Sequence, residues 1–256
     1  MGEPATRLTP PEEWPNDDPF RLGWRLKSVR LPDGSSEIRE VPLTAEDLLD
    51  PQVGDHVTQN SWHISTAHQL LGILQARYKS QPDVLVTCDM KIIWGIAGLE
   101  SPSPDLAIIP GVRDRGRFRR SFRVKRERAQ PVLVVELVSD EPEHKSADHD
   151  KKVKIYQRAG VPEYVIADPP YTPSGCRLTG YRLNRAGRYE PIPPDSQGRI
   201  LSVTTSLGFA PAGETIDLID AETGERLLTD SEARKRLEEE NAKLRAELER
   251  LRNSKS

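Results

Sequence analysis

Pro-Val-Leu-Val-Val-Glu-Leu-Val-Ser, residues 131–139, is a run of branched apolar residues that contains one carboxylate, Glu136. Such a run is typical of a strand that is buried on both faces of a sheet. An ionised carboxylate in that position is costly unless a cation compensates its charge. Two explanations fit the sequence, namely an ion pair with an Arg or Lys, or a metal site.

A second short strand also carries an acid. Ser-Pro-Asp-Leu-Ala-Ile-Ile-Pro (residues 103–110) places Asp105 at the start of an apolar run. If this strand neighbours the strand at 131–139, the carboxylates of Asp105 and Glu136 lie close together. Two adjacent acids followed by a lysine-bearing helix favour the metal site over a single ion pair.

That helix is predicted for residues 148–159, because Gly160 follows as a stop signal. Asp148, Lys152 and Ile155 recur at helical spacing and therefore share one face. Since Ile155 should face the sheet, the same face carries Lys152 towards the carboxylates.

The segment Glu-Tyr-Val-Ile-Ala-Asp-Pro, residues 163–169, predicts another buried strand after this helix. A right-handed crossover would make it parallel to the strand at 131–139. The sequence therefore predicts an α/β fold with strand–helix–strand connectivity at its centre.

Five segments resemble the Uma2 family, also called DUF820, a bacterial branch of the PD-(D/E)XK restriction-endonuclease-like superfamily. The segments are Pro104-Asp105, Val-Glu-Leu-Val-Ser (135–139), Asp148-x-x-x-Lys152, Tyr-x-x-Ala-Gly-Val-Pro-Glu-Tyr (156–164) and Asp168-Pro169. The resemblance extends from about residue 41 to about residue 218. It implies a restriction-endonuclease-like mixed central sheet flanked by helices, and a DNA endonuclease activity.

The resemblance also implies roles for particular residues. Asp105 and Glu136 would be the metal-binding acids, and Asp89 falls where the family often has another acid. The superfamily's lysine is expected two residues after the glutamate, where this chain has Val138. Lys152 on the following helix is its natural replacement, as in this branch generally.

The chemistry of phosphodiester hydrolysis suits these residue types. A divalent cation polarises the phosphoryl oxygen and lowers the pKa of the attacking water. Mg²⁺, or Mn²⁺ in its place, suits two carboxylates plus waters. The ammonium of Lys152 could stabilise charge that develops on the phosphate, and Asp148 could orient that ammonium.

Residues 113–128, between the two acid-bearing strands, contain nine Arg or Lys against two acids. This segment is either a solvated loop or a clamp on phosphates, and its position beside the predicted site favours the clamp. It offers no base-specific pattern, so we expect contacts to the nucleic-acid backbone. The candidates for these contacts are Arg119, Arg120, Arg123, Lys125 and Arg126.

A helix is also predicted for residues 61–78. Its expected buried stripe consists of apolar side chains at helical spacing, which are Ile64, Ala67, Leu70, Leu71 and Leu74. His63 and His68 lie near its start, and we expect histidines with satisfied or exposed rings rather than catalytic ones.

Outside the nuclease-like domain at 41–220 lie an arm and a tail. Residues 1–40 are rich in Pro and charge and predict an extended arm with a hairpin about Pro32-Asp33-Gly34.

At the start of the nuclease-like domain, Thr44 and Asp47 form a capping box that predicts a short helix.

The tail, residues 229–253, has the heptad pattern of a leucine zipper, with Leu237, Asn241, Leu244, Leu248 and Leu251 at its core positions. Either a parallel homodimer or a single frayed helix fits this pattern, and the homodimer is the preferred interpretation.

The composition sets wider limits. A net charge of −3 over 256 residues gives no global basic character, and two distant cysteines fit a reducing cytoplasm. No apolar run is long enough for a membrane span. A different class also stays open, namely a non-catalytic DNA-binding or assembly protein that keeps the fold with a weakened site.

Overall fold

Strand β8 (Leu133–Leu137) lies inside a six-stranded mixed sheet and is buried along its whole length. The computed structural model describes residues 18–139, 147–170 and 175–253. The sheet has the order β11-β10-β9-β8-β6-β4. Its other strands are β4 (Leu85–Thr87), β6 (Leu106–Ile109), β9 (Glu163–Asp168), β10 (Arg177–Leu183) and β11 (Tyr189–Ile192).

The pairing of these strands confirms the predicted connectivity. Strands β8 and β9 are parallel, and all other neighbours in the sheet are antiparallel. The crossover from β8 to β9 includes a π-helical turn, η1 (Ala147–Lys152), followed by α4 (Val153–Ala159). The helix ends at Gly160 with φ of 77°, as predicted, but its first six residues are π-helical rather than α-helical.

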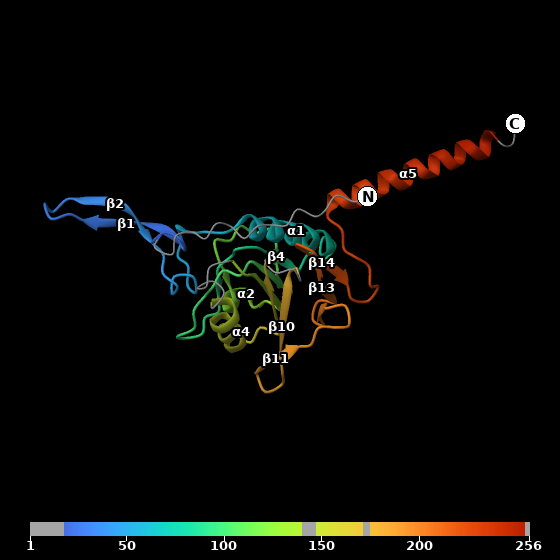
Figure 1. Ribbon diagram of the computed structural model, residues 1–256. Coiled ribbons are helices and arrows are strands. Elements are labelled where there is room, and N and C mark those ends of the chain that lie inside the picture. Colours follow the sequence, from blue (N-terminus) through green and yellow to red (C-terminus); the bar gives the residue numbers. More distant parts are fainter. Residues whose placement is uncertain (1–17, 140–146, 171–174, 254–256) are drawn as a thin grey trace.

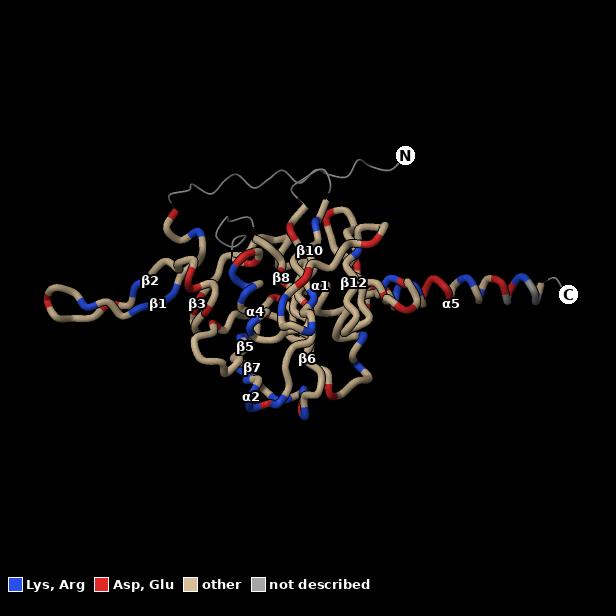
Figure 2. Tube along the Cα trace, turned by 90° about the horizontal axis from the view of Figure 1, so that it is seen from below, with Lys and Arg blue, Asp and Glu red and all other residues tan. Residues whose placement is uncertain are grey.

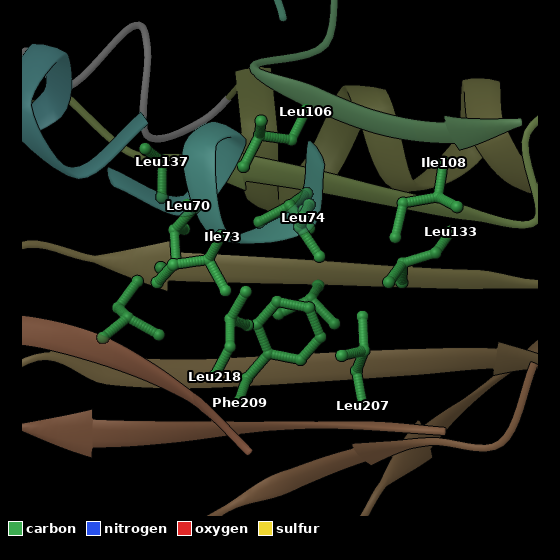
Figure 3. Close-up of a cluster of buried hydrophobic side chains, with 14 of the residues drawn as sticks. Leu70, Ile73, Leu74, Leu106, Ile108, Leu133, Leu137, Leu207, Phe209 and Leu218 are labelled. Carbon is green, nitrogen blue, oxygen red and sulfur yellow. The ribbon is translucent and has the colours of Figure 1, made fainter. Parts of the chain in front are cut away.

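Alternate residues of β8 enter two different cores, as expected of a strand buried on both faces. Leu133, Val135 and Leu137 point into the core beneath α1 (Ser61–Arg77). This core also receives β12 (Ile200–Ser202), β13 (Leu207–Ala212) and β14 (Thr215–Asp220), which form a second, three-stranded sheet. Figure 3 shows leucines of α1 and β8 meeting Phe209 and Leu218.

The opposite face of the sheet is covered by α4, by the short parallel pair β5 (Ile92–Ile93) and β7 (Phe122–Arg123), and by α2 (Val124–Glu127). Val134 of β8 and Val138, which directly follows the strand, belong to this second core. Glu136 lies between them in sequence and on the same face, which places its carboxylate under α4.

The predicted helix at 61–78 is confirmed as α1, but its predicted buried stripe is partly wrong. Ile64 is 43% exposed, whereas Trp62, His63 and Ile73 are buried. The indole of Trp62 donates to the carbonyl of Glu214 in the β13–β14 turn. The helix is therefore rotated towards the second sheet, which the helical period alone does not reveal.

Glu163, at the start of β9, is fully buried and joins the two sheets. Its carboxylate accepts hydrogen bonds from the hydroxyls of Ser202 and Thr204 and from the backbone N–H of Val203. The guanidinium of Arg182 donates to the same carboxylate over 2.8 Å. This single acid therefore fixes the segment after β12 against the central sheet.

The N-terminal hairpin is confirmed as β1 (Gly23–Arg30) and β2 (Ser36–Pro42), with β3 (Asp55–Val57) at its base. Figure 1 shows it extending from the body on the side opposite α5. The capping bonds between Thr44 and Asp47 form, but residues 45–49 are turns rather than a helix. Pro51 limits the length of any helix here, because Asp50, the residue before the proline, is disfavoured in helical conformation.

The C-terminal helix is α5 (Asp230–Asn253), and the capping box at its start is present. The Thr229 N–H and hydroxyl donate to the Glu232 carboxylate, and the Glu232 N–H donates to the Thr229 hydroxyl. Leu237 and Leu244 are 58% and 52% exposed. Within the described residues, no helix is long and apolar enough to cross a membrane.

Candidate active site

Asp105 and Glu136 lie side by side because β6 and β8 are antiparallel neighbours. The register pairs Leu106 with Val135. Asp105, which precedes Leu106, therefore lies opposite Glu136, which follows Val135. The backbone N–H of Asp105 donates to Oε2 of Glu136 over 3.4 Å. Oδ2 of Asp105 accepts from the N–H of Leu137 over 2.6 Å. Both carboxylates are buried, with Glu136 entirely removed from solvent.

Lys152 reaches these acids from the helical crossover. Its ammonium lies 3.0 Å from Oε2 of Glu136 and 2.7 Å from Oδ1 of Asp148. Asp148 and Lys152 are both in the π-helical turn η1, and such turns are frequent at functional sites. Asp105, Glu136, Lys152 and Asp148, which the sequence singled out, are thus brought together.

Two further residues belong to this cluster and were not predicted for it. Nε2 of His63 lies 3.1 Å from Oδ1 of Asp105, and the His63 ring is buried. The hydroxyl of Tyr156 donates to Oε1 of Glu136 over 2.5 Å. Tyr156 follows Lys152 by four residues, so its shared helical face was a usable signal. His63 belongs to a distant helix, and nothing in its local sequence indicated that it would contact Asp105.

Burial and mutual repulsion shape the electrostatics of the cluster. Burial raises the pKa of Glu136 well above its ordinary range, and Asp105 and Asp148 add to this rise while Lys152 opposes it. Burial likewise raises the pKa of Asp148. For Asp105, His63 and Lys152 outweigh burial and hold the pKa below its ordinary value. Burial acts to lower the pKa of Lys152, but Asp148 and Glu136 raise it, so Lys152 stays cationic.

The donor set can be tested against a divalent cation. Across residues 18–139, 147–170 and 175–253, no three His, Cys, Asp or Glu side chains are arranged as ready-made metal ligands. Asp105 and Glu136 remain as a two-acid oxygen donor set of the kind that Mg²⁺ takes together with waters. The raised pKa values of Glu136 and Asp148 mean that, among the described groups, ionisation of both acids leaves negative charge that a bound cation would compensate. The residues therefore fit a hard divalent ion.

Asp89, the weaker acid candidate, lies next to the strand that carries Asp105. Its backbone N–H donates to the carbonyl of Pro104 over 3.1 Å, and its φ of 50° is unusual for a residue other than glycine. The residue itself is exposed. Asp89 therefore lies at the rim of the cluster rather than within it.

The basic segment is placed differently from the expectation. Asp105 and Glu136 lie at one end of the β6–β8 pair, whereas residues 113–128 leave and rejoin these strands at the other end. Figure 2 shows Lys and Arg gathered around α2 and β7.

Arg119 is not available as a free cation. Its side chain is 4% exposed and binds Glu127 over 3.1 Å and the carbonyl of Asp114 over 2.6 Å. The sequence predicted a phosphate contact for Arg119, whereas its guanidinium bonds within the loop in this structure. The other four candidates, Arg120, Arg123, Lys125 and Arg126, are exposed.

Comparison with known proteins places the chain in a family. The family model described as "Uma2: Putative restriction endonuclease" matches residues 48–217. A similar solved structure is that of a "putative nuclease belonging to DUF820 from Anabaena variabilis ATCC 29413". It has 16% sequence identity and a TM-score of 0.39, and the match covers 57% of this chain and 74% of that chain. No curated protein matches the sequence. With more than half of its length matched by the family model, the chain belongs to the Uma2 family of restriction-endonuclease-like proteins.

Proposed function

We propose that this protein is a metal-dependent endonuclease that hydrolyses DNA phosphodiester bonds. The observation that carries the proposal is the position of the Lys152 ammonium, in contact with Glu136 and Asp148 beside Asp105. The Uma2 membership supports the reaction class. Asp105 and Glu136 would hold Mg²⁺ or Mn²⁺, which when bound polarises the phosphate and supplies a water of lowered pKa.

The chain's own residues have distinct tasks in this proposal. Lys152 stabilises negative charge that develops on the phosphate oxygens in the transition state. Electrostatic stabilisation of this kind is usually the largest single contribution to the rate of an enzyme reaction. Asp148 holds the ammonium of Lys152 in place through their 2.7 Å ion pair. His63 and Tyr156 act as positioning residues, because each binds one of the two acids and fixes its orientation.

Plasmid nicking in Mg²⁺ tests the proposal. The wild type should convert supercoiled plasmid to open circles, and Glu136→Gln should lower the rate by at least about a hundredfold. Glu225→Gln, in an exposed turn after β14, serves as the matched control and should retain activity. Equal nicking by wild type and Glu136→Gln would contradict the assignment of Glu136.

A non-catalytic DNA-binding or assembly role is the second candidate, and one observation favours it. Val138 is buried where the superfamily pattern has its lysine, and among the described residues the ammonium beside the acids comes from the crossover helix. A protein of this second kind would bind DNA with a steep salt dependence and leave the plasmid intact in both Mg²⁺ and Mn²⁺.

The exposed basic residues Arg120, Arg123, Lys125 and Arg126 support contacts to the DNA backbone. Because they lie on the loop that joins the far ends of β6 and β8, they would bind phosphates away from the cleaved bond. We expect the protein to act in the cytoplasm. A DNA substrate suits that compartment, and its reducing conditions suit the two free cysteines, Cys88 and Cys176.

A parallel homodimer through α5 completes the proposal, because Leu237 and Leu244 are exposed at core heptad positions. Truncation after Leu228 should halve the mass in solution. Leu244→Lys should do the same, while Ala242→Lys, two residues away and off the seam, should leave the dimer intact. Light scattering on all four proteins checks this. Identical masses for the full chain and the truncated chain would refute the zipper.

A further inference from the structure

A small cavity lies within the basic segment, away from the carboxylate cluster. It encloses about 380 Å³, and its lining consists of five arginines and two acids. This is a size that accommodates a phosphate with part of its sugar, at the lower end of the range for ligand pockets. The cavity is built from residues 113–119 on one side and 126–128 on the other.

Arg119 makes the frame of this cavity. Its guanidinium donates to the carbonyls of Asp114 and Arg117 over 2.6 and 3.0 Å, and to both carboxylate oxygens of Glu127. These bonds tie the two sides of the cavity together. They also neutralise Glu127, since the bond from Arg119 is the main reason that the pKa of Glu127 lies below its ordinary value.

The other four arginines of the lining have a different status. Arg113, Arg117, Arg126 and Arg128 are exposed, and in the described part of the chain their guanidinium groups make no intramolecular ion pair or hydrogen bond. Asp114 is then the one acid of the lining that Arg119 does not neutralise. The cavity therefore presents four cationic groups against one carboxylate, which favours an anion of more than one charge or a polyanion.

The backbone at Arg128 is strained in a way that supports a binding role. Arg128 has φ of 54° and ψ of 33° at the end of α2, a left-handed conformation that rarely holds an arginine. Glycine would take this conformation at no steric cost. An arginine kept there gives up stability and places a guanidinium at the cavity, a pattern found at ligand-binding positions.

The place of the cavity in the fold separates it from the site of cleavage. Asp105 immediately precedes β6, whereas Arg113 follows its far end. The four residues of β6 alone span about 14 Å at roughly 3.4 Å per residue, and three more residues separate the strand from Arg113. At about 3.4 Å of axial rise per nucleotide along one DNA strand, such a separation corresponds to several nucleotides. An anion in the cavity is therefore a different phosphate from the one beside Lys152.

We propose that this arginine cavity is a second phosphate site, which binds a backbone phosphodiester of a nucleic-acid strand several nucleotides from the bond at the carboxylate cluster. Guanidinium groups suit this ligand because their planar donors match phosphate oxygens in pairs. That the bound phosphate belongs to a nucleic acid rests on the proposed function. That the cavity binds a phosphate group at all is inferred from its arginine lining.

The test compares Arg117→Gln/Arg128→Gly with wild type. Glycine at 128 removes a charge and relieves the left-handed backbone, so thermal unfolding should occur at the same or a higher temperature. The matched control is Arg185→Gln, an exposed arginine in the β10–β11 turn. Binding of a fluorescent 20-base-pair duplex is measured by anisotropy in EDTA, over a range of KCl concentrations.

We expect the double variant to bind the duplex about tenfold more weakly and to lower the slope of log affinity against log salt by about 1, the effect of one lost phosphate contact. Arg185→Gln should have the same affinity for the duplex and the same salt slope as the wild type. Unchanged affinity and slope in the double variant would overturn the proposal.

Inorganic phosphate added at constant ionic strength distinguishes the source of the anion. It should weaken duplex binding by wild type and have little effect on the double variant. If inorganic phosphate binds to the wild type but not to the variant, while both bind the duplex equally, the cavity takes a free anion and the nucleic-acid assignment fails. Since binding is measured in EDTA, failure to nick plasmid would contradict the proposed function without touching this result.

Discussion

Replacing Lys152 by methionine is expected to lower the rate of DNA cleavage by at least about a hundredfold and to lower the free energy of unfolding by about 3–5 kcal/mol. The activity falls because the charge that develops on the phosphate loses its fixed cation. The stability falls because Glu136 and Asp148 are buried and both lose the ammonium that binds them.

The matched control is Lys154→Met, on the exposed side of the same helix. It should change the free energy of unfolding by no more than about 0.5 kcal/mol. Urea denaturation in EDTA measures the stability of each protein, and plasmid nicking measures the rate. An active Lys152→Met protein, or one as stable as Lys154→Met, would contradict the role given to Lys152.

The pH dependence of stability follows from the same cluster. Glu136 and Asp148 have raised pKa values in the folded protein, so their contribution is full below the ordinary carboxyl values and is lost as pH rises. The pKa of His63 is also raised, because Asp105 outweighs the opposing effect of burial, and it acts in the same direction above 6.5. Asp105 has a lowered pKa, so its contribution to stability is full at neutral pH and is lost only as the pH falls below the ordinary carboxyl value.

The metal-free protein should therefore become less stable between pH 5 and pH 8, by up to about 1.4 kcal/mol per pH unit for each group that titrates. Mg²⁺ should reduce this loss, because a bound cation compensates the ionised acids. Urea midpoints at several pH values, with EDTA and with Mg²⁺, measure the effect. Stability that rises with pH in EDTA would show that the acids are not held as described.

The second large effect is expected at Glu163, far from the reaction. Glu163→Ala should cost about 3–5 kcal/mol, because Arg182 loses its partner and the backbone N–H groups of Val203 and Thr204 lose their buried acceptor. The hydroxyls of Ser202 and Thr204 would also lose their acceptor. Glu225→Ala, which removes an exposed carboxylate, should cost no more than about 0.5 kcal/mol.

Urea denaturation measures both variants, and hydrogen exchange adds a local test. Residues 200–206 should exchange faster in Glu163→Ala, since Glu163 fixes that segment against the central sheet. A loss of stability no larger than that of Glu225→Ala would show that Glu163 does not join the two sheets.

The sequence predicted the parts of this fold that depend on short-range patterns. The end of α4 followed from Gly160, the start of α5 from the Thr229–Glu232 capping box, and the parallel pair β8–β9 from the handedness of a single crossover. The convergence of Asp105, Glu136 and Lys152 was also predicted, because neighbouring strands and one helical face were enough to place them.

The remaining features depend on contacts between distant segments. His63 meets Asp105 only because α1 is rotated towards the second sheet, where Trp62 bonds to Glu214. Arg119 carries the same charge as its neighbours, and only its position beside Glu127 makes it structural. The basic loop was expected beside the acids, since sequence proximity gave no indication that the antiparallel pair β6–β8 would place it at the opposite end.

A crystal structure of the protein soaked in Mn²⁺ tests the central claim most directly. The account predicts an anomalous difference peak bound by carboxylate oxygens of both Asp105 and Glu136, at about 2.2 Å from each, with the Lys152 ammonium beside it. A crystal with no peak there, or with Mn²⁺ bound only elsewhere, would contradict it.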